Sequence, residues 1–514
     1  MPPRTAVFSI ISLNYNAYAK TLMESLSANH PEWDRHVLLV DRCDELAAVG
    51  GGLFETTLVE NLPLPNMRAF LFRYDILELN TAVKPSMFAH LRERGYQRVI
   101  YLDPDILVVD RLVELEKLLD DGAAVVVTPH LTAPLDDGFR PSEFDILQAG
   151  TYNLGFLAIA DRPAADAFIA WWQDKLEYGA ASDQEGGLFT DQKWVDLAPG
   201  MFGGFALLRD PGYNLAYWNL SHRPVTKRDG QWMAGGSPLR FFHFSGFDPA
   251  DPAPFSRHQN RYTLETIGPA RELATDYAAR LLRHGYLESR TRPYAFGTFN
   301  DGTPIPSAIR WMYRKETALA AAAGADPFAC VQIFLESDYG GLPIVMRGVW
   351  SKHLHVQRVF PDLLGSSRAA FQNWFFKVGA REHSIPEAFL RSARLVVEQP
   401  ISYFSDSLTI DEIPAAASIW ARGLAMLHRR ATGGLLSQAR WAEYRQVDGL
   451  AAFLRLGWRR WRQGGRPAPR KSLLHVGTRP LPRDGLSAAS PRSADEPILP
   501  PGRSDPDPGR GAEP

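Results

Sequence analysis

The stretch that decides the fold is VIYLDPDILVVD, residues 99–110. Its two apolar runs, 99–102 and 106–109, have the length of short buried strands, and an acidic turn separates them. Asp103 and Asp105 stand in that turn, and Pro104 restricts its own backbone and that of Asp103. Two carboxylates at the end of a buried strand are costly unless a positive group meets them, and a hard divalent cation is one such group. An acidic turn without a ligand is the plainer alternative.

Length and charge narrow the class of protein. The 514 residues are too many for one ordinary domain, so two domains and a tail are expected. Lys and Arg total 56 and Asp and Glu total 58, which argues against a general nucleic-acid-binding protein. Cys43 and Cys330 are too few and too far apart for a disulfide framework or a zinc cluster. A cytoplasmic location is expected, because the N-terminal apolar run is typical of a core strand and no run of about 18 apolar residues follows.

The first half predicts an α/β sheet with helices on both faces. Strands are expected at 6–13, 37–41, 123–129 and 152–160, and helices at 18–29, 66–80, 82–95 and 161–178. In such sheets ligands bind beyond the carboxyl ends of the strands. Asn14, Tyr15 and Asp41 fall at those ends, together with the two aspartates of the acidic turn.

Four further polar residues, Lys84, Asn153, Asp191 and Gln192, each have a plain structural interpretation. Lys84 begins a helix, where a cation opposes the helix dipole, so it is either a solvated lysine or a phosphate contact. Asn153 precedes a small residue at the entrance of a strand, where it either binds a sugar hydroxyl or caps the strand. Asp191 and Gln192 follow Thr190 in an apolar setting, and a helix with Thr190 as its N-cap is the plainer reading.

His243 and the absence of a Gly-rich phosphate-binding motif help to predict which ligand the protein binds. His243 alternates with aromatic residues at 239–246 and is either a core histidine or a metal ligand. Neither a G-x-G-x-x-G sequence after the first strand nor a Walker motif is present, which argues against a nicotinamide-dependent oxidoreductase and a P-loop enzyme. A bound nucleotide would then need a metal to balance its diphosphate, and Asp103 and Asp105 would supply ligands.

The composition changes along the chain. After about residue 262 Ala, Leu and Arg recur at helical spacing, for example at 270–282, 369–379 and 415–428. We therefore expect a first domain at 1–262 and a mainly helical domain at 263–463, whose contact with a membrane surface stays open. Residues 464–514 are dominated by Pro, Arg, Gly, Ser and Asp, and too few apolar residues remain to offset the ordering entropy. A disordered tail is expected there.

Six stretches, in order, resemble the nucleotide-diphospho-sugar glycosyltransferases of the GT-A fold, and most of all the glycogenin-like and bacterial galactosyltransferase-like group. They are Asn14-Tyr15 after the first strand, Lys84-Pro85, YLDPDILVV, YNLGFLAI, FTDQKWV and FFHFSG. The resemblance covers about the first half of the chain and implies a Rossmann-like GT-A domain. It also implies a metal-dependent glycosyltransferase. The enzyme would move a sugar from a nucleotide-diphospho-sugar, with UDP as the expected nucleotide, to a saccharide or lipid-linked acceptor in surface polysaccharide or glycoconjugate synthesis.

The same resemblance implies roles for the metal and nucleotide residues. Asp103 and Asp105 match the pair that holds Mn²⁺ or Mg²⁺ on the donor diphosphate, and His243 matches the histidine that completes this metal site. Asn14 and Tyr15 match the residues under the base and ribose of the nucleotide.

The sugar-side roles follow in the same way. Lys84 matches a basic position near the diphosphate and the donor sugar, and Asn153 matches the residue that faces this sugar. Asp191 and Gln192 match the pair beside the anomeric carbon, where positive charge develops, and are the candidate catalytic residues. The entry side of the acceptor hydroxyl decides between retention and inversion, and the sequence does not show it.

One departure from the family pattern leaves alternatives open. The histidine motif of the family often continues to G-x-x-K-P-W, whose Lys meets the leaving phosphate, whereas here Gly246 leads into FDP. The leaving-group cation then has to come from elsewhere, with Lys84 and Arg257 as candidates. The missing Lys favours a non-catalytic sugar-nucleotide-binding or scaffold protein as the alternative function, whereas the presence of Asp103, Asp105, Asp191 and His243 argues against it. A nucleotidyltransferase is a further alternative, and the missing Gly-rich loop argues against it.

Overall fold

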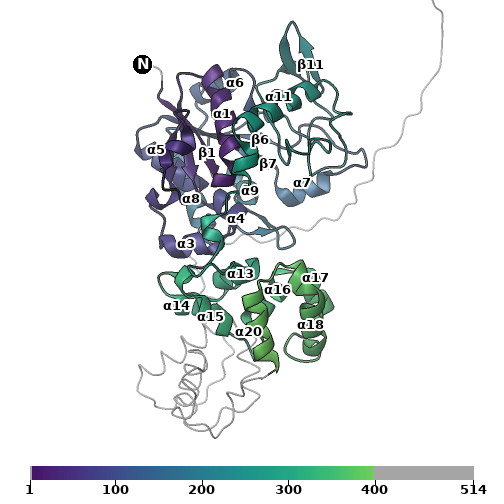
Figure 1. Ribbon diagram of the computed structural model, residues 1–514. Coiled ribbons are helices and arrows are strands. Elements are labelled where there is room, and N and C mark those ends of the chain that lie inside the picture. Colours follow the sequence, from purple (N-terminus) through teal and green to yellow (C-terminus); the bar gives the residue numbers. More distant parts are fainter. Residues whose placement is uncertain (1–2, 399–514) are drawn as a thin grey trace, which may run out of the picture. The chain divides into compact units, whose positions relative to one another are not determined.

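The computed structural model describes residues 3–398 (Figure 1). The expected helix at 415–428 and the expected disordered tail at 464–514 lie outside the described residues. Among the described residues, no helix combines the length and the apolar character needed to cross a membrane.

A seven-stranded mixed sheet forms the centre of the N-terminal part, in the order β10-β6-β7-β4-β1-β2-β3. Its strands are β1 Thr5–Ile11, β2 Asp34–Leu39, β3 Glu55–Leu58, β4 Arg98–Leu102, β6 Val125–Pro129, β7 Tyr152–Ala160 and β10 Phe205–Leu207. β1 runs parallel to β2 and β4, whereas β7 is antiparallel to β4 and β6. The expected α/β class is confirmed. The edge strand β3 was not predicted, because it has only four residues and little pattern.

Helices cover both faces of this sheet, and the side chains of each strand alternate between the faces. Ala6, Phe8 and Ile10 of β1 belong to one hydrophobic cluster, and Val7 and Ile11 belong to another. The first cluster includes residues of α5 Lys84–Glu93 and α8 Pro163–Leu176, and the second includes residues of α1 Asn16–Asn29 and α6 Val113–Asp120. Fully apolar strands are therefore buried on both sides, as the sequence predicts.

Two local predictions are wrong. The expected helix at 66–80 is divided into α3 Met67–Arg73 and α4 Ile76–Ala82, because Tyr74 is extended and Asp75 begins a new helix with a capping box to Glu78. Thr190 is not a helix N-cap, because it has a positive φ of 48° and α9 Gln192–Val195 begins after Asp191.

A second, two-stranded sheet joins distant parts of the sequence. β5 Ile106–Val108 pairs antiparallel with β14 Phe241–His243, so that His243 lies opposite Ile106. The apolar run that follows the acidic turn is therefore a strand, as expected. This pairing brings the C-terminal end of β14 beside Asp103 and Asp105.

Shorter elements complete the N-terminal part. The helices are α2 Leu46–Gly50, α7 Glu143–Ala149 and α10 Ala198–Met201, and a 3₁₀ turn, η1, spans Leu13–Tyr15. The strands are β8 Ser182–Asp183, β9 Leu188–Phe189, β11 Val225–Arg228, β12 Gln231–Ala234 and β13 Ser237–Pro238. β8 and β9 pair with each other and lead into Asp191.

The remainder of the described chain is mainly helical, as expected (Figure 1, teal to green). Its helices are α11 Ala270–Arg283, α12 Tyr286–Ser289, α13 Ser307–Lys315, α14 Thr317–Ala323, α15 Val331–Glu336, α16 Ile344–Lys352, α17 Leu354–Val359, α18 Arg368–Trp374, α19 Ala380–Glu382 and α20 Glu387–Glu398. Tyr277 of α11 shares a hydrophobic cluster with Tyr18 of α1, and buried Arg314 of α13 lies 2.7 Å from Glu78. A domain boundary at residue 262 stays a prediction.

Candidate metal centre and nucleotide pocket

The pairing of β5 with β14 gathers the three predicted metal ligands. His243 Nε2 lies 3.0 Å from Asp105 Oδ1 and 3.7 Å from Asp103 Oδ2. One ligand atom from each of the three residues lies within 4.8 Å of the others. Two carboxylates and one imidazole nitrogen form a donor set that suits Mn²⁺, which accepts oxygen and nitrogen, and also suits Mg²⁺ through the oxygens. The residues present therefore fit a divalent cation.

The electrostatics of the cluster are those of a cation site. Burial raises the pKa of Asp103 above its ordinary value. Burial opposes protonation of His243, but the charges of Asp105 and Asp103 outweigh it, so the pKa of His243 lies above its ordinary value. The cluster thus attracts a positive charge to Nε2, and a metal ion would replace the proton there.

Gly155 in the middle of β7 makes room for the imidazole. A Cβ at this position would lie 2.4 Å from His243 Cε1 and 2.8 Å from Asn153 Oδ1. The carbonyl oxygen of Gly155 also accepts the N–H of Asp103 at 2.8 Å. A glycine inside a strand often marks such a close approach, and this was a signal for a functional position that the sequence offered.

Lys84 is buried rather than solvated. Its Nζ lies 2.6 Å from Asp191 Oδ2, and both side chains are 2% exposed. Nζ also donates to the carbonyl oxygen of Leu154 at 2.9 Å and lies 4.1 Å from the ring centre of Tyr101. Since the Lys84 charge already compensates the buried Asp191 charge, the expectation of a solvated lysine is wrong.

The amides of Asn153 and Gln192 are engaged inside the protein. Gln192 Oε1 accepts the N–H of Leu154 at 2.9 Å, and Gln192 Nε2 donates to the carbonyl oxygen of Ala149 at 3.0 Å. Asn153 Oδ1 accepts the N–H of Gly155 at 3.1 Å. Both residues are buried beside β7, and their contacts with a donor sugar stay predictions.

A pocket of about 400 Å³ adjoins the acidic turn. It is lined by Asp105 and by the predicted nucleotide residues Asn14 and Tyr15, and its other lining residues include Tyr18, Gly246, Phe247, Asp248, Arg257, Tyr286 and Arg290. Tyr15 stacks on Tyr18 with ring centres 4.7 Å apart, and burial raises the pKa of Tyr15 to about 12. Asp103, Lys84, Asn153, Asp191, Gln192 and His243 do not line this pocket.

Several residues around the site escaped sequence reasoning. Tyr286 and Arg290 reach the pocket from the helical part, for which the sequence predicted no site residue. Asn214 contacts His243 Nδ1 through Oδ1 at 3.1 Å, and it has a positive φ of 53°. Asn214 lies in a segment rich in Phe, Tyr and Asn, where no local pattern distinguishes it from its neighbours.

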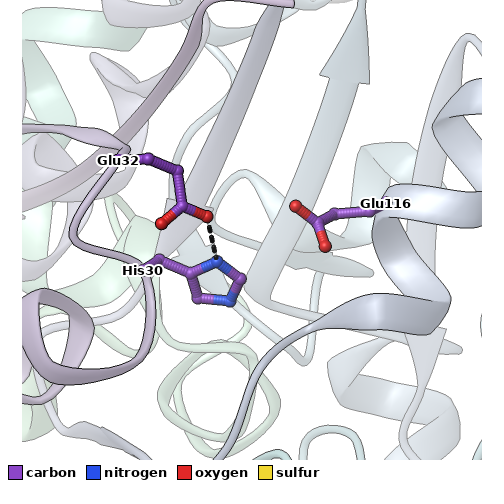
Figure 2. Close-up of side chains that lie close together, drawn as sticks. All are labelled: His30, Glu32 and Glu116. Carbon is purple, nitrogen blue, oxygen red and sulfur yellow. Dashed lines mark hydrogen bonds and ion pairs between the residues drawn. The ribbon is translucent and has the colours of Figure 1, made fainter. Parts of the chain in front are cut away.

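A second histidine–carboxylate cluster consists of His30, Glu32 and Glu116 (Figure 2). His30 Nδ1 lies 3.3 Å from Glu32 Oε1, and His30 Nε2 accepts the N–H of Leu112 at 2.9 Å. Both ring nitrogens are therefore used within the protein. Arg111 Nη2 lies 2.6 Å from Glu32 and 3.6 Å from Glu116, so a cation is already in place. This cluster does not suit a metal ion.

Comparisons with known proteins give distant relatives. No family model matches the chain. Two uncharacterised proteins of Bacillus subtilis (strain 168) are similar to parts of it. YfnF is 27% identical over 154 residues, which are 29% of this chain and 50% of YfnF. YfnD is 33% identical over 127 residues, which are 24% of this chain and 39% of YfnD. The chain thus spans half or less of the relatives it matches.

Several solved structures that resemble the chain are glycosyltransferases. The galactosyltransferase LgtC, in complex with donor and acceptor sugar analogs, is 21% identical and covers 53% of this chain and 95% of its own, with a TM-score of 0.31. Mouse xyloside xylosyltransferase 1 is 15% identical and covers 47% of this chain and 98% of its own, with a TM-score of 0.30.

Proposed function

We propose that the protein is a metal-dependent glycosyltransferase that takes a sugar from a nucleotide-diphospho-sugar, with a UDP-sugar as the expected donor. A saccharide or lipid-linked molecule would be the acceptor, in surface polysaccharide or glycoconjugate synthesis. The observation that carries the proposal is the position of Asp105. This carboxylate belongs both to the cluster with Asp103 and His243 and to the lining of the pocket with Asn14 and Tyr15.

We propose that the metal cluster and the pocket bind different parts of the nucleotide-sugar donor. Asp103, Asp105 and His243 would hold Mn²⁺ or Mg²⁺, which when bound neutralises charge on the departing nucleoside diphosphate. The diphosphate would lie next to Asp105, where the pocket begins. Tyr15 offers an aromatic face to the base, and Asn14 offers an amide to the ribose hydroxyls.

Arg257 is the better candidate for the cation that meets the leaving group. It is exposed, it lines the same pocket as Asp105, and among residues 3–398 it forms no ion pair with a carboxylate. Lys84, the other candidate, is buried and paired with Asp191. Arg290 also lines the pocket but lies 3.6 Å from Asp248. Arg257 can therefore bind a phosphate without giving up an ion pair.

Asp191 and Gln192 are the proposed catalytic residues. The carboxylate of Asp191 would stabilise positive charge at the anomeric carbon as the sugar–phosphate bond breaks. Lys84 fixes this carboxylate by its 2.6 Å contact, and Gln192 is fixed by the backbone of Leu154 and Ala149. Fixed groups lose little freedom when the transition state forms, which favours electrostatic stabilisation.

The test is a titration of the purified protein with nucleotide sugars, with and without Mn²⁺, while donor hydrolysis is followed. We expect metal-dependent binding of one nucleoside-diphosphate class and slow release of the nucleoside diphosphate. An Arg257→Ala variant should weaken binding, and Lys20→Ala gives a matched control outside the pocket. Binding without turnover, even with acceptor extracts, would favour a non-catalytic sugar-nucleotide-binding protein. Failure of every nucleoside diphosphate to bind would contradict both.

A further inference from the structure

We infer that Asn214 is a positioning residue for the metal centre. The Asn214 side chain holds the His243 ring so that Nε2, and not Nδ1, faces Asp103 and Asp105. The inference rests on the metal-dependent function proposed above and adds a residue to which no sequence motif assigns a role. It is carried by a chain of hydrogen bonds that runs from the backbone of β7 to the imidazole.

The direction of these hydrogen bonds follows from one backbone N–H. Gly155 N donates to the side chain of Asn153 at 3.1 Å, so the atom it meets has to be the amide oxygen, Oδ1. The same oxygen lies 3.0 Å from the side chain of Asn214. The group of Asn214 that faces it is therefore the NH₂ group, which donates.

The orientation of Asn214 then sets the tautomer of His243. The Asn214 NH₂ group also donates to Thr128 Oγ1 at 2.8 Å, so both of its hydrogens are used. Its Oδ1 lies 3.1 Å from His243 Nδ1 and can only accept. Nδ1 therefore carries a hydrogen, and the lone pair of the neutral ring is on Nε2, 3.0 Å from Asp105.

The surroundings hold this arrangement in place. Asn214 is 1% exposed and Asn153 is 8% exposed, so water does not compete for their hydrogen bonds. Gly155 lies against the His243 ring on one side, and Trp218 packs its ring edge-on at 5.2 Å. At the far end of the chain, Asn153 Nδ2 donates to His130 Nε2 at 3.1 Å. Burial lowers the pKa of His130 to about 4, so His130 is neutral and can accept this bond.

Asn153 thereby has a structural role besides the sugar contact that the sequence suggests. Its oxygen accepts from both Gly155 and Asn214, and one hydrogen of its NH₂ group is given to His130. Hydrogen bonds through His243, Asn214 and Asn153 thus connect the metal centre to strand β7. Partners that orient a ligating histidine commonly change metal affinity 10- to 100-fold when they are removed.

The test compares two substitutions that keep the positive φ of residue 214. Asn214→Gly removes the side chain, and Asn214→Asp keeps an oxygen that accepts from Nδ1; both residue types tolerate this backbone conformation. We expect the Kd for Mn²⁺, measured by electron paramagnetic resonance, to rise roughly 10- to 100-fold in Asn214→Gly. The rise should be smaller in Asn214→Asp, which keeps the acceptor for Nδ1 but loses the N–H donors to Asn153 and Thr128. Asn66→Gly is the matched control, because Asn66 also has a positive φ, of 47°, and lies before α3.

A double-mutant cycle separates positioning from a general loss of stability. In a His243→Ala background, Asn214→Gly should cause no further loss of Mn²⁺ affinity, since the ligand that it orients is gone. The loss in the wild-type background should also be larger for Mn²⁺ than for Mg²⁺, which prefers oxygen ligands. Equal Mn²⁺ affinity of wild-type protein and Asn214→Gly overturns this inference and leaves the proposed function standing. Absence of Mn²⁺ binding by the wild-type protein overturns both.

Discussion

Two clusters of one histidine and two carboxylates differ in what surrounds the imidazole. In the cluster of Asp103, Asp105 and His243, Nε2 faces the carboxylates and Nδ1 is held by Asn214. In the cluster of His30, Glu32 and Glu116 (Figure 2), the ring is drawn beside the two glutamates. Both of its nitrogens are engaged, and Arg111 supplies the positive charge. Residue types alone therefore do not define a candidate metal site; it also needs a ring nitrogen that faces carboxylates rather than a backbone N–H.

The largest expected effect is the loss of one carboxylate from the first cluster. Asp105→Ala should weaken Mn²⁺ binding by at least about 100-fold, because removal of a direct ligand exceeds the 10- to 100-fold cost of removing its supports. Isothermal titration calorimetry would measure the affinity. Glu116→Ala removes the equivalent group from the second cluster and should leave Mn²⁺ binding unchanged. Equal effects of the two substitutions would contradict the distinction between the clusters.

Gly155→Ala should have the next largest effect. The added Cβ would lie 2.4 Å from His243 Cε1, so the ring has to move and its Nε2 leaves the carboxylates. We expect Mn²⁺ affinity to fall roughly 10-fold or more, as for loss of an orienting contact. Gly200→Ala is the control, because a Cβ there meets no atom within 4 Å. Unchanged Mn²⁺ affinity in Gly155→Ala would show that His243 is not a ligand.

His30 of the second cluster should make the free energy of unfolding depend on pH. Burial lowers the pKa of His30 from 6.5 to about 4, so the unfolded chain binds a proton first as the pH falls. The contribution of His30 is thus present above pH 6.5 and is lost as the pH falls toward 4, by up to about 3 kcal/mol. Urea unfolding at a series of pH values would measure this slope.

His30→Gln should flatten the slope between these pH values, since glutamine can still accept from the N–H of Leu112 but does not titrate here. His355→Gln serves as the control, because the side chain of His355 is 61% exposed. If His30→Gln retains the full wild-type slope, the buried neutral state of His30 is not its cause.

The smallest effect is expected from Arg111→Ala. Arg111 and its two glutamates are partly exposed, so the free energy of unfolding should fall by no more than about 1 kcal/mol. Removing this cation should still not create a Mn²⁺ site, because Nε2 of His30 remains occupied by the N–H of Leu112. A second Mn²⁺ equivalent bound by Arg111→Ala would show that charge, rather than the ring nitrogens, separates the two clusters.

Much of the fold could be predicted because it depends on local pattern. The apolar runs of β1, β4 and β7 predict strands buried on both faces, and 270–282 predicts helix α11. The break between α3 and α4 was missed, although Asp75 and Glu78 have the spacing of a capping box. This helix start could have been predicted, because the capping-box pattern lies within four consecutive residues.

The candidate site is different, since its parts are brought together by contacts between distant residues. An apolar run such as FFHF predicts a strand but not the strand it pairs with, because hydrophobic alternation specifies a face and leaves the partner open. The pairing of β14 with β5 decides that His243 meets Asp103 and Asp105. The same holds for Lys84 and Asp191, whose 2.6 Å contact joins the start of α5 to the turn between β9 and α9.

The sequence by itself determined the α/β class, the buried strands and the acidic turn with its two aspartates, because side-chain hydrophobicity and the restriction by Pro104 act within a few residues. Only the tertiary structure decided which histidine is available to a metal ion. His30 and His243 are both buried, and they differ in whether a backbone N–H or a pair of carboxylates faces Nε2. That difference depends on the packing of segments far apart in the chain, which no local pattern records.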